Sequence, residues 1–160
     1  MVSKKFASYI MLPAVLLFAA ACNDNSSPFV PDYSTVPELP VNLTDEADWV
    51  TDEGVRVYVA NEGRENGLEV GIRDEVTVWY TSRTLDTERI LQSTYSNGFT
   101  SPVTLPGVAA QTTILYVQKN LPLGVVGMIE GERRVLVFTD SLTTATVGII
   151  LDIEVYTIDY

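Results

Sequence analysis

The sequence predicts an α+β domain that consists mostly of β-sheet, with at most one short helix. Residues 54–94 and 121–160 alternate apolar and polar residues in the way that half-buried strands do. Glycines interrupt both stretches where strands must turn, and no long helical period occurs after residue 21. These three observations favour a single sheet-rich fold.

The first 21 residues have the pattern of a secretory signal. Lys4 and Lys5 precede an apolar run over residues 10–21, which contains a proline and is too short to cross a bilayer comfortably. The run ends in small residues, and Cys22, the only cysteine, follows them directly. We therefore predict a signal peptide over residues 1–21, and no disulfide within the chain.

The residues around Cys22 resemble a bacterial lipobox, although Ala19 stands where a larger aliphatic residue is usual. The resemblance implies cleavage before Cys22 and acylation of its thiol and new amino group, as in palmitate-bearing lipoproteins. Each buried methylene contributes about 0.8 kcal/mol, so two or three acyl chains anchor a protein to a membrane durably. The alternatives are an ordinary cleaved signal with an incidental cysteine, or an uncleaved anchor helix.

The net charge narrows the choice of partners. Cleavage removes Lys4 and Lys5, so the net charge of −11 becomes −13. Such a surface argues against nucleic acid as a partner and against docking on anionic lipid. Removing 21 residues from 160 leaves 139, which is the usual size of a single domain.

Residues 22–43 are predicted to be an acylated cysteine followed by a tether, because four of the eight prolines fall among serines and asparagines there. An extended tether of this length reaches about 60 Å at 3.1 Å per residue. No strong acidic export tag follows Cys22. We expect a bacterial membrane-anchored lipoprotein that faces the periplasm, with surface exposure left open.

The domain proper is predicted over residues 44–160, and it opens with five carboxylates around Trp49 in residues 44–53. A calcium loop is one interpretation, but the spacing lacks the glycine and the terminal glutamate of an EF-hand. We expect a solvated acidic turn with Trp49 packed against the domain. No metal and no cofactor is predicted, since the chain has no histidine, one cysteine and no phosphate-binding glycine loop.

The alternation assigns the individual strands. Val55, Val57 and Val59 share one face, and Val76, Val78 and Tyr80 share another. Later strands are expected over residues 132–138 and 148–158. Residues 121–129 have room for one or two helical turns, which two glycines make marginal.

From residue 54 onward, the order of these pieces resembles the FKBP family of peptidyl-prolyl isomerases. That family opens with a strand, a glycine-rich turn, and a Gly-Asp pair leading into a strand that ends Tyr-Thr-Gly. The corresponding residues are 54–60, 61–67, Arg73-Asp74 and 76–82. The family's Leu-x-Asp-Gly-x-x-Phe-Asp-Ser-Ser resembles LDTERILQST at residues 85–94.

Two further motifs extend the resemblance to the C-terminus. The family's Gly-x-x-x-Met-x-x-Gly-x-Arg is matched by Gly124, Met128, Gly131 and Arg133. Its closing strand, of the form Leu-x-Phe-Asp-Val-Glu-Leu, resembles IILDIEV at residues 149–155. The resemblance implies an FKBP-like twisted antiparallel sheet.

The resemblance also implies a peptide-binding pocket. Tyr80 matches the pocket tyrosine, and the Phe-Asp of the pocket wall corresponds to Leu91-Gln92. The tryptophan of the pocket floor corresponds to Leu121, and the phenylalanine of the last strand to Leu151. Read without the resemblance, Tyr80 is an ordinary strand tyrosine and the other residues belong to the core or its rim.

Two departures from the family bear on function. Residues 107–124 are longer than usual in the family, which leaves the register of Leu121 open. The family's Tyr-Ala-Tyr-Gly segment and long lid are replaced by DSLTTATV at residues 140–147. The framework of the family is therefore present, while its aromatic pocket and lid are mostly missing.

Two classes of function remain open. An apolar, water-poor pocket catalyses rotation about an X-Pro bond, a barrier of about 18–20 kcal/mol, by binding the twisted amide most tightly, with no proton transfer. The chain is accordingly expected to bind proline-containing or unfolded peptides in the cell envelope, with weak or residual isomerase activity. The alternative is a non-catalytic interaction or scaffold lipoprotein of an envelope complex.

Overall fold

The computed structural model describes residues 29–44 and 49–159. Residues Pro31–Tyr160 form one compact unit, and the description that follows concerns that unit. Cys22, the predicted signal peptide and residues 22–28 of the predicted tether lie outside the described residues. None of the helices in the described part of the chain has the length and apolar character that crossing a membrane requires.

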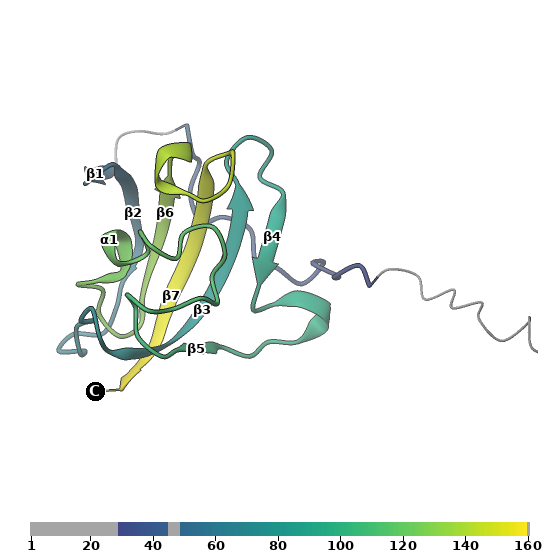
Figure 1. Ribbon diagram of the computed structural model, residues 1–160. Coiled ribbons are helices and arrows are strands. Elements are labelled where there is room, and N and C mark those ends of the chain that lie inside the picture. The colour runs from purple at the N-terminus through teal and green to yellow at the C-terminus, as the bar shows by residue number, and fades with distance from the viewer. Residues whose placement is uncertain (1–28, 45–48, 160) are drawn as a thin grey trace, which may run out of the picture. The chain divides into compact units, whose positions relative to one another are not determined.

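One seven-stranded antiparallel sheet forms the domain (Figure 1), so the predicted α+β class and the antiparallel sheet are confirmed. Its order is β1-β2-β6-β7-β3-β4, and β5 pairs with β3 beside this path. The helix α1 (Pro122–Val125) is a single turn, within the segment where the sequence left room for one. The strands are β1 (Val50–Asp52), β2 (Val55–Glu62), β3 (Glu75–Thr84), β4 (Ile90–Ser93), β5 (Val103–Leu105), β6 (Glu132–Phe138) and β7 (Ile149–Asp159).

We call the side of the sheet that carries α1 the front face, and the opposite side the back face (Figure 1). Val55 and Val57 of β2 join Val76, Val78 and Tyr80 of β3 in one apolar cluster. The two sets of alternating residues thus meet on the front face. The expected third member of the first set, Val59, is 44% exposed, because a bulge in the β2–β6 pairing follows it directly.

The glycines that make α1 marginal by propensity are explained by its packing. A Cβ on Gly124 would come within 2.5 Å of a methyl carbon of Leu136 on β6, so only glycine lets the turn lie this close to the sheet. Arg134 donates hydrogen bonds to the carbonyls of Gly124 and Gly127, and it also pairs with Glu132. The cation thereby satisfies carbonyl groups that the end of the helix leaves free.

Residues 106–120, between β5 and α1, cover the rest of the front face (Figure 1). Val108, Ile114 and Val117 are buried in the same cluster as the sheet residues. Lys119, the only lysine left after the predicted cleavage, is exposed. The segment whose register was open is therefore a packed cover over the sheet.

A strap formed by residues 31–43 crosses the back face. Its alternating Leu39, Val41 and Leu43 pack against a small cluster of Val135, Val137 and Ile150 on β6 and β7. Part of the stretch that the sequence predicted as a tether thus lies against the sheet. The physical reason is that its three aliphatic side chains share one side and cover apolar surface that water would otherwise reach.

Polar contacts hold the same strap to the edge of the sheet. Tyr33 donates a hydrogen bond from its hydroxyl to the Leu91 carbonyl at 3.1 Å, and Thr35 donates to the Tyr95 carbonyl. Arg83 of β3 donates to the Pro37 carbonyl at 2.8 Å. Since β4 is the last strand on this side, these contacts protect an edge that would otherwise offer free backbone groups.

Trp49 packs against the back face, as the sequence predicted. Its ring centroid lies 5.6 Å from that of Tyr58 on β2, and the guanidinium of Arg56 lies 4.6 Å from the indole centroid. Residues 45–48 of the acidic stretch lie outside the described residues. Within the described ranges, 29–44 and 49–159, no three metal-binding side chains gather in one place.

Candidate functional site

The structure brings four of the five predicted peptide-binding residues into the front-face cluster. Tyr80, Leu121 and Leu151 are buried members of that cluster, and the half-buried Leu91 packs against them. Leu121 and Leu151 have no exposed surface, and Tyr80 is 6% exposed. The residues that correspond to the pocket of the FKBP family therefore form a filled apolar core with only its edge open.

Tyr80 is the polar group of this cluster. Burial raises the pKa of its phenol, and the neighbouring Tyr33 adds to the effect. Its backbone is clamped, because the Tyr80 N–H donates to the Thr94 hydroxyl at 3.1 Å and the Thr94 N–H donates to the Tyr80 carbonyl at 3.0 Å. Among the described residues no group hydrogen-bonds the Tyr80 hydroxyl.

The fifth predicted residue, Gln92, holds the cover of the front face in place. Its side-chain nitrogen donates to the Thr113 carbonyl at 3.3 Å, and its oxygen accepts the Leu115 N–H at 2.9 Å. Both ends of the amide are thus engaged with residues 106–120. In this arrangement Gln92 links β4 to the cover of the front face.

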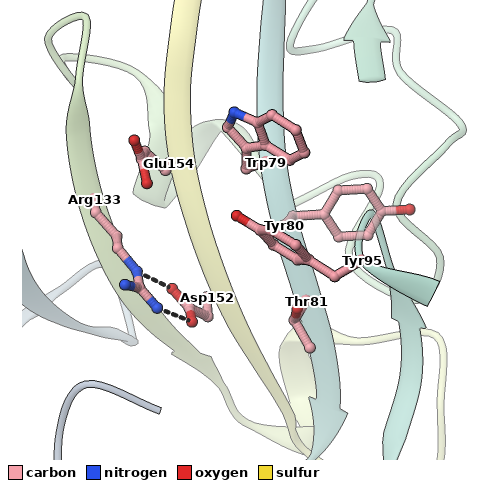
Figure 2. Close-up of a pocket in the computed structure, with 7 residues that line it drawn as sticks. All are labelled: Trp79, Tyr80, Thr81, Tyr95, Arg133, Asp152 and Glu154. Carbon is pink, nitrogen blue, oxygen red and sulfur yellow. Dashed lines mark hydrogen bonds and ion pairs between the residues drawn. The ribbon is translucent and has the colours of Figure 1, made fainter. Parts of the chain in front are cut away.

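A second candidate site lies on the back face, beside the strap. Figure 2 shows side chains from four segments converging there, with Arg133, Asp152 and Glu154 on one side and Trp79 and Tyr95 on the other. The hollow between them has about 190 Å³ of empty space, which includes the solvent that opens onto it. It is a shallow surface site and not an enclosed cavity.

The strand register explains why these residues meet. Trp79 of β3 and Arg133 of β6 both lie opposite Glu154 of β7 in the antiparallel pairing, so three neighbouring strands project these side chains side by side. Thr81 lies opposite Asp152 by the same register. The back-face positions of the strands therefore carry polar and aromatic groups here, although they carry aliphatic groups under the strap.

Aromatic rings form one wall of the hollow. Tyr95, just after β4, stacks on Trp79 with ring centroids 5.2 Å apart and planes inclined by 22°. Tyr156 of β7 meets the same indole edge-on at 6.5 Å, and it is 48% exposed. Such a group of rings presents both apolar area and the negative faces of its π-systems.

An ion pair and a further carboxylate form the other wall. Arg133 binds Asp152 with two parallel hydrogen bonds of 2.9 and 2.7 Å, and this pairing raises the pKa of Arg133. Glu154 takes part in no ion pair among the described residues. Burial raises the pKa of the Tyr95 phenol, and the charge of Glu154 adds to the rise.

Sequence reasoning missed this second site because it followed the apolar residues of each strand. The alternation that places Tyr80 and Leu151 on the front face places Trp79 and Asp152 on the back face. A signal was present in the closing strand, where Asp152, Glu154 and an aromatic residue occupy the alternate positions. Reading both faces of the strand would have found it.

No family model matches the sequence, and no curated protein matches it. Solved structures do match. The N-terminal domain of FKBP42 from Arabidopsis thaliana superposes with a TM-score of 0.58 at 17% identity, over 75% of this chain and 98% of that chain. FkpA from Escherichia coli has a TM-score of 0.56 at 17% identity, over 71% of this chain and 53% of its own.

A peptidyl-prolyl cis-trans isomerase from Pseudomonas syringae pv. tomato superposes with a TM-score of 0.54 at 14% identity, over 72% of this chain and 84% of that chain. These likenesses show that the domain has an FKBP-like fold. The resemblance read from the sequence is thereby confirmed for the fold.

Proposed function

We propose that this chain is a membrane-anchored, FKBP-like lipoprotein of the bacterial envelope that binds peptide or protein segments, with weak or residual peptidyl-prolyl isomerase activity. The observation that supports it is the position of Tyr80 at the edge of an apolar cluster on the front face of this fold. One of the solved structures with this fold is named a peptidyl-prolyl cis-trans isomerase. Peptide clients are accordingly the partners proposed.

The same geometry explains why catalysis is expected to be weak. A prolyl ring needs an open apolar pocket that excludes water around the twisted amide. Leu121 and Leu151 are fully buried, so a ring reaches Tyr80 only from the edge formed by Leu91, unless residues 106–120 move. Opening that cover breaks the two hydrogen bonds of Gln92 and exposes apolar surface.

A second candidate function follows from this burial. A domain whose prolyl pocket is filled by its own side chains acts as a non-catalytic interaction module that holds a partner in an envelope complex. Full burial of Leu121 and Leu151 favours this alternative over an efficient enzyme.

An isomerisation assay on a proline-containing tetrapeptide separates the two functions. We expect a rate just above that of buffer, which falls to the buffer value in Tyr80→Phe because the phenol that faces the bound amide is lost. Tyr156→Phe is the matched control, since it removes a hydroxyl from an exposed tyrosine on the back face. A rate equal to buffer for the unmodified protein would remove the enzyme and leave the interaction module.

The anchor has its own test. We expect radiolabelled palmitate to enter the protein in a bacterial host and to be absent from Cys22→Ala. Undiminished labelling of the variant would contradict acylation at Cys22. Fractionation of the labelled cells then shows which membrane carries the protein.

A further inference from the structure

The back face has a region that the proposed function does not use. We call it the open half, and it consists of the stacked Trp79 and Tyr95, the edge-on Tyr156, the Arg133–Asp152 pair and Glu154. All of these residues except Tyr156 line the shallow hollow of Figure 2. No side chain of the strap lines it, although Thr35 of the strap donates a hydrogen bond to the Tyr95 carbonyl beside it. A site with three aromatic rings and an unpaired carboxylate has the chemistry to bind a cation.

We propose that the open half of the back face binds a lysine or arginine side chain presented by an extended segment of a partner protein. The hollow opens on the back face; Tyr80, whose side chain belongs to the front-face cluster, is also among the residues that line it. This proposal does not rest on the proposed peptide binding at the front face, and each can fail alone.

The local charges favour a cation over an anion. Arg133 directs two N–H groups at Asp152, so the charges of these two residues neutralise each other. Glu154 then gives the site a net charge of −1 from its three charged side chains. The chain as a whole carries −11, so a basic partner is attracted from a distance and an acidic one is repelled.

The aromatic wall favours the same occupant. A cation near an aromatic face is attracted by the negative quadrupole of the ring, and tryptophan is the most favourable ring for this contact. Tyr156 is 48% exposed, and Trp79 and Tyr95 are each half-buried, so the wall is accessible from solvent. A carboxylate beside such a wall binds the charge of the cation while the rings contact its aliphatic stem.

A contact between a cation and an aromatic ring already occurs within the molecule, on the same face of the sheet. Near the strap, Arg56 lies over the ring of Trp49, 4.6 Å from its centroid, and Tyr58 packs beside that ring. In the open half, Trp79 has its tyrosines, but no cation–aromatic contact is formed among the described residues. A basic side chain from a partner would supply the missing component.

The shape of the site indicates an extended segment as the carrier. The strap that covers the other half of the face is itself an extended chain, which contributes every second side chain to the sheet. The open half continues the same surface along β6 and β7, and its hollow is shallow and open. Such a surface takes one side chain of an extended segment, with its neighbours resting on the exposed aromatic edge.

The indole N–H resonance of Trp79 in the protein purified in detergent provides the test. The probe is a capped pentapeptide, Gly-Leu-Lys-Leu-Gly, and the same peptide with glutamine or glutamate in place of lysine serves as the comparison. We expect the lysine peptide to shift the Trp79 signal in a saturable way, while the signal of Trp49 in the covered half stays in place. Trp79→Phe assigns the two signals.

Glu154→Gln is the decisive variant, because it removes the charge and keeps the size of the side chain. We expect it to raise the Kd of the lysine peptide about fivefold, because a partly exposed ion pair between Glu154 and the lysine contributes up to about 1 kcal/mol. Glu65→Gln, an exposed carboxylate in the turn between β2 and β3, is the matched control and should leave the Kd unchanged.

Three results would overturn the proposal. The first is a Trp79 signal that does not move up to the solubility limit of the lysine peptide. The second is an equal or larger shift with the glutamate peptide, which would assign the site to an anion on Arg133. The third is an unchanged Kd in Glu154→Gln. The isomerisation assay with Tyr80→Phe is independent of all three.

Discussion

The two halves of the back face are built from the same strands but have opposite chemistry. In the covered half, β6 and β7 present Val135, Val137 and Ile150, and the strap buries them. In the open half, the same two strands present Arg133 and Glu154 next to water. β6 and β7 therefore change from aliphatic to charged residues beyond the part that Leu39, Val41 and Leu43 of the strap cover.

The difference shows how an exposed sheet face stays soluble. An aliphatic patch without a cover would remain in contact with water and invite association, so it occurs only beneath the strap. Where no cover exists, the surface in contact with water consists of the ion pair of Arg133 with Asp152 and the partly exposed aromatic rings, in place of an aliphatic patch. The rings retain apolar area at the surface, and this remaining area is what makes the open half a candidate docking site.

The largest effect is expected from a cavity under the strap. Ile150→Ala removes a side chain with no exposed surface, so we expect a loss of about 2–4 kcal/mol in the free energy of unfolding, measured by urea denaturation. The matched variant in the open half, Tyr156→Ala, should lose less than about 1 kcal/mol, because its ring is 48% exposed. Equal losses in the two variants would break the distinction between the halves.

A smaller loss is expected from the ion pair of the open half. Asp152→Asn leaves Arg133 without its charged partner. We expect the free energy of unfolding, measured by urea denaturation, to fall by about 1–3 kcal/mol, because Asp152 is nearly buried and Arg133 is only partly exposed. Glu154→Gln, two positions along the same strand and unpaired, should stay within about 0.5 kcal/mol of the parent. A greater loss in Glu154→Gln would show that its charge stabilises the fold.

The strap itself is expected to contribute about 1 kcal/mol per side chain. Leu39→Ala removes a half-buried side chain, so we expect it to lower the free energy of unfolding by less than the same substitution at a fully buried leucine would. Leu68→Ala, at a leucine that is 41% exposed and outside the strap, is the comparison and should lose less. Hydrogen exchange at the strap amides should accelerate in Leu39→Ala alone, and no change there would contradict the packing of the strap.

The smallest effect is expected on the free energy of unfolding at alkaline pH. Burial and Glu154 raise the pKa of Tyr95 above its ordinary value of 10.0, so the fold prefers the neutral phenol. This contribution is complete below pH 10 and is lost as the pH rises through the raised pKa, because the unfolded chain ionises first. Tyr95→Phe should therefore reduce the loss of stability above pH 10.

An ultraviolet titration of the tyrosine phenols tests whether Glu154 raises the pKa of Tyr95. Glu154→Gln should lower the pKa of Tyr95 toward its ordinary value, while Tyr80, whose pKa is raised by burial on the front face, should not respond. A shift of both tyrosines, or of neither, would disconnect Glu154 from the aromatic wall.

The four longest strands, β2, β3, β6 and β7, were predictable from residue order alone, whereas the short strands β1, β4 and β5 were not assigned. Val76 and Val78 of β3 alternate with polar residues, and burial of one face of a sheet permits only this period. The single turn α1 was also anticipated, together with its glycines, although Gly124 was read as a weakness of the helix. Its close approach to Leu136 is a property of packing between distant segments, which residue order does not express.

Whether the candidate sites are open or filled was not predictable from the sequence. The sequence placed Tyr80, Leu121 and Leu151 in one region, but whether they line an open pocket or fill a core depends on residues 106–120. Those residues have no regular period, so their fold is decided by the apolar surface on which they settle. The strap was read as a tether for the same reason.

The sequence by itself therefore determined the class of fold, the positions of its four longest strands, and most of the residues that face the two sides of the sheet. The reason is that strand alternation is a local property with a period of two residues. Only the tertiary structure decided which surfaces are covered and which are open, because coverage depends on irregular segments packing against strands far away in the chain. This packing buries Leu121 and leaves Trp79 and Glu154 accessible to a partner.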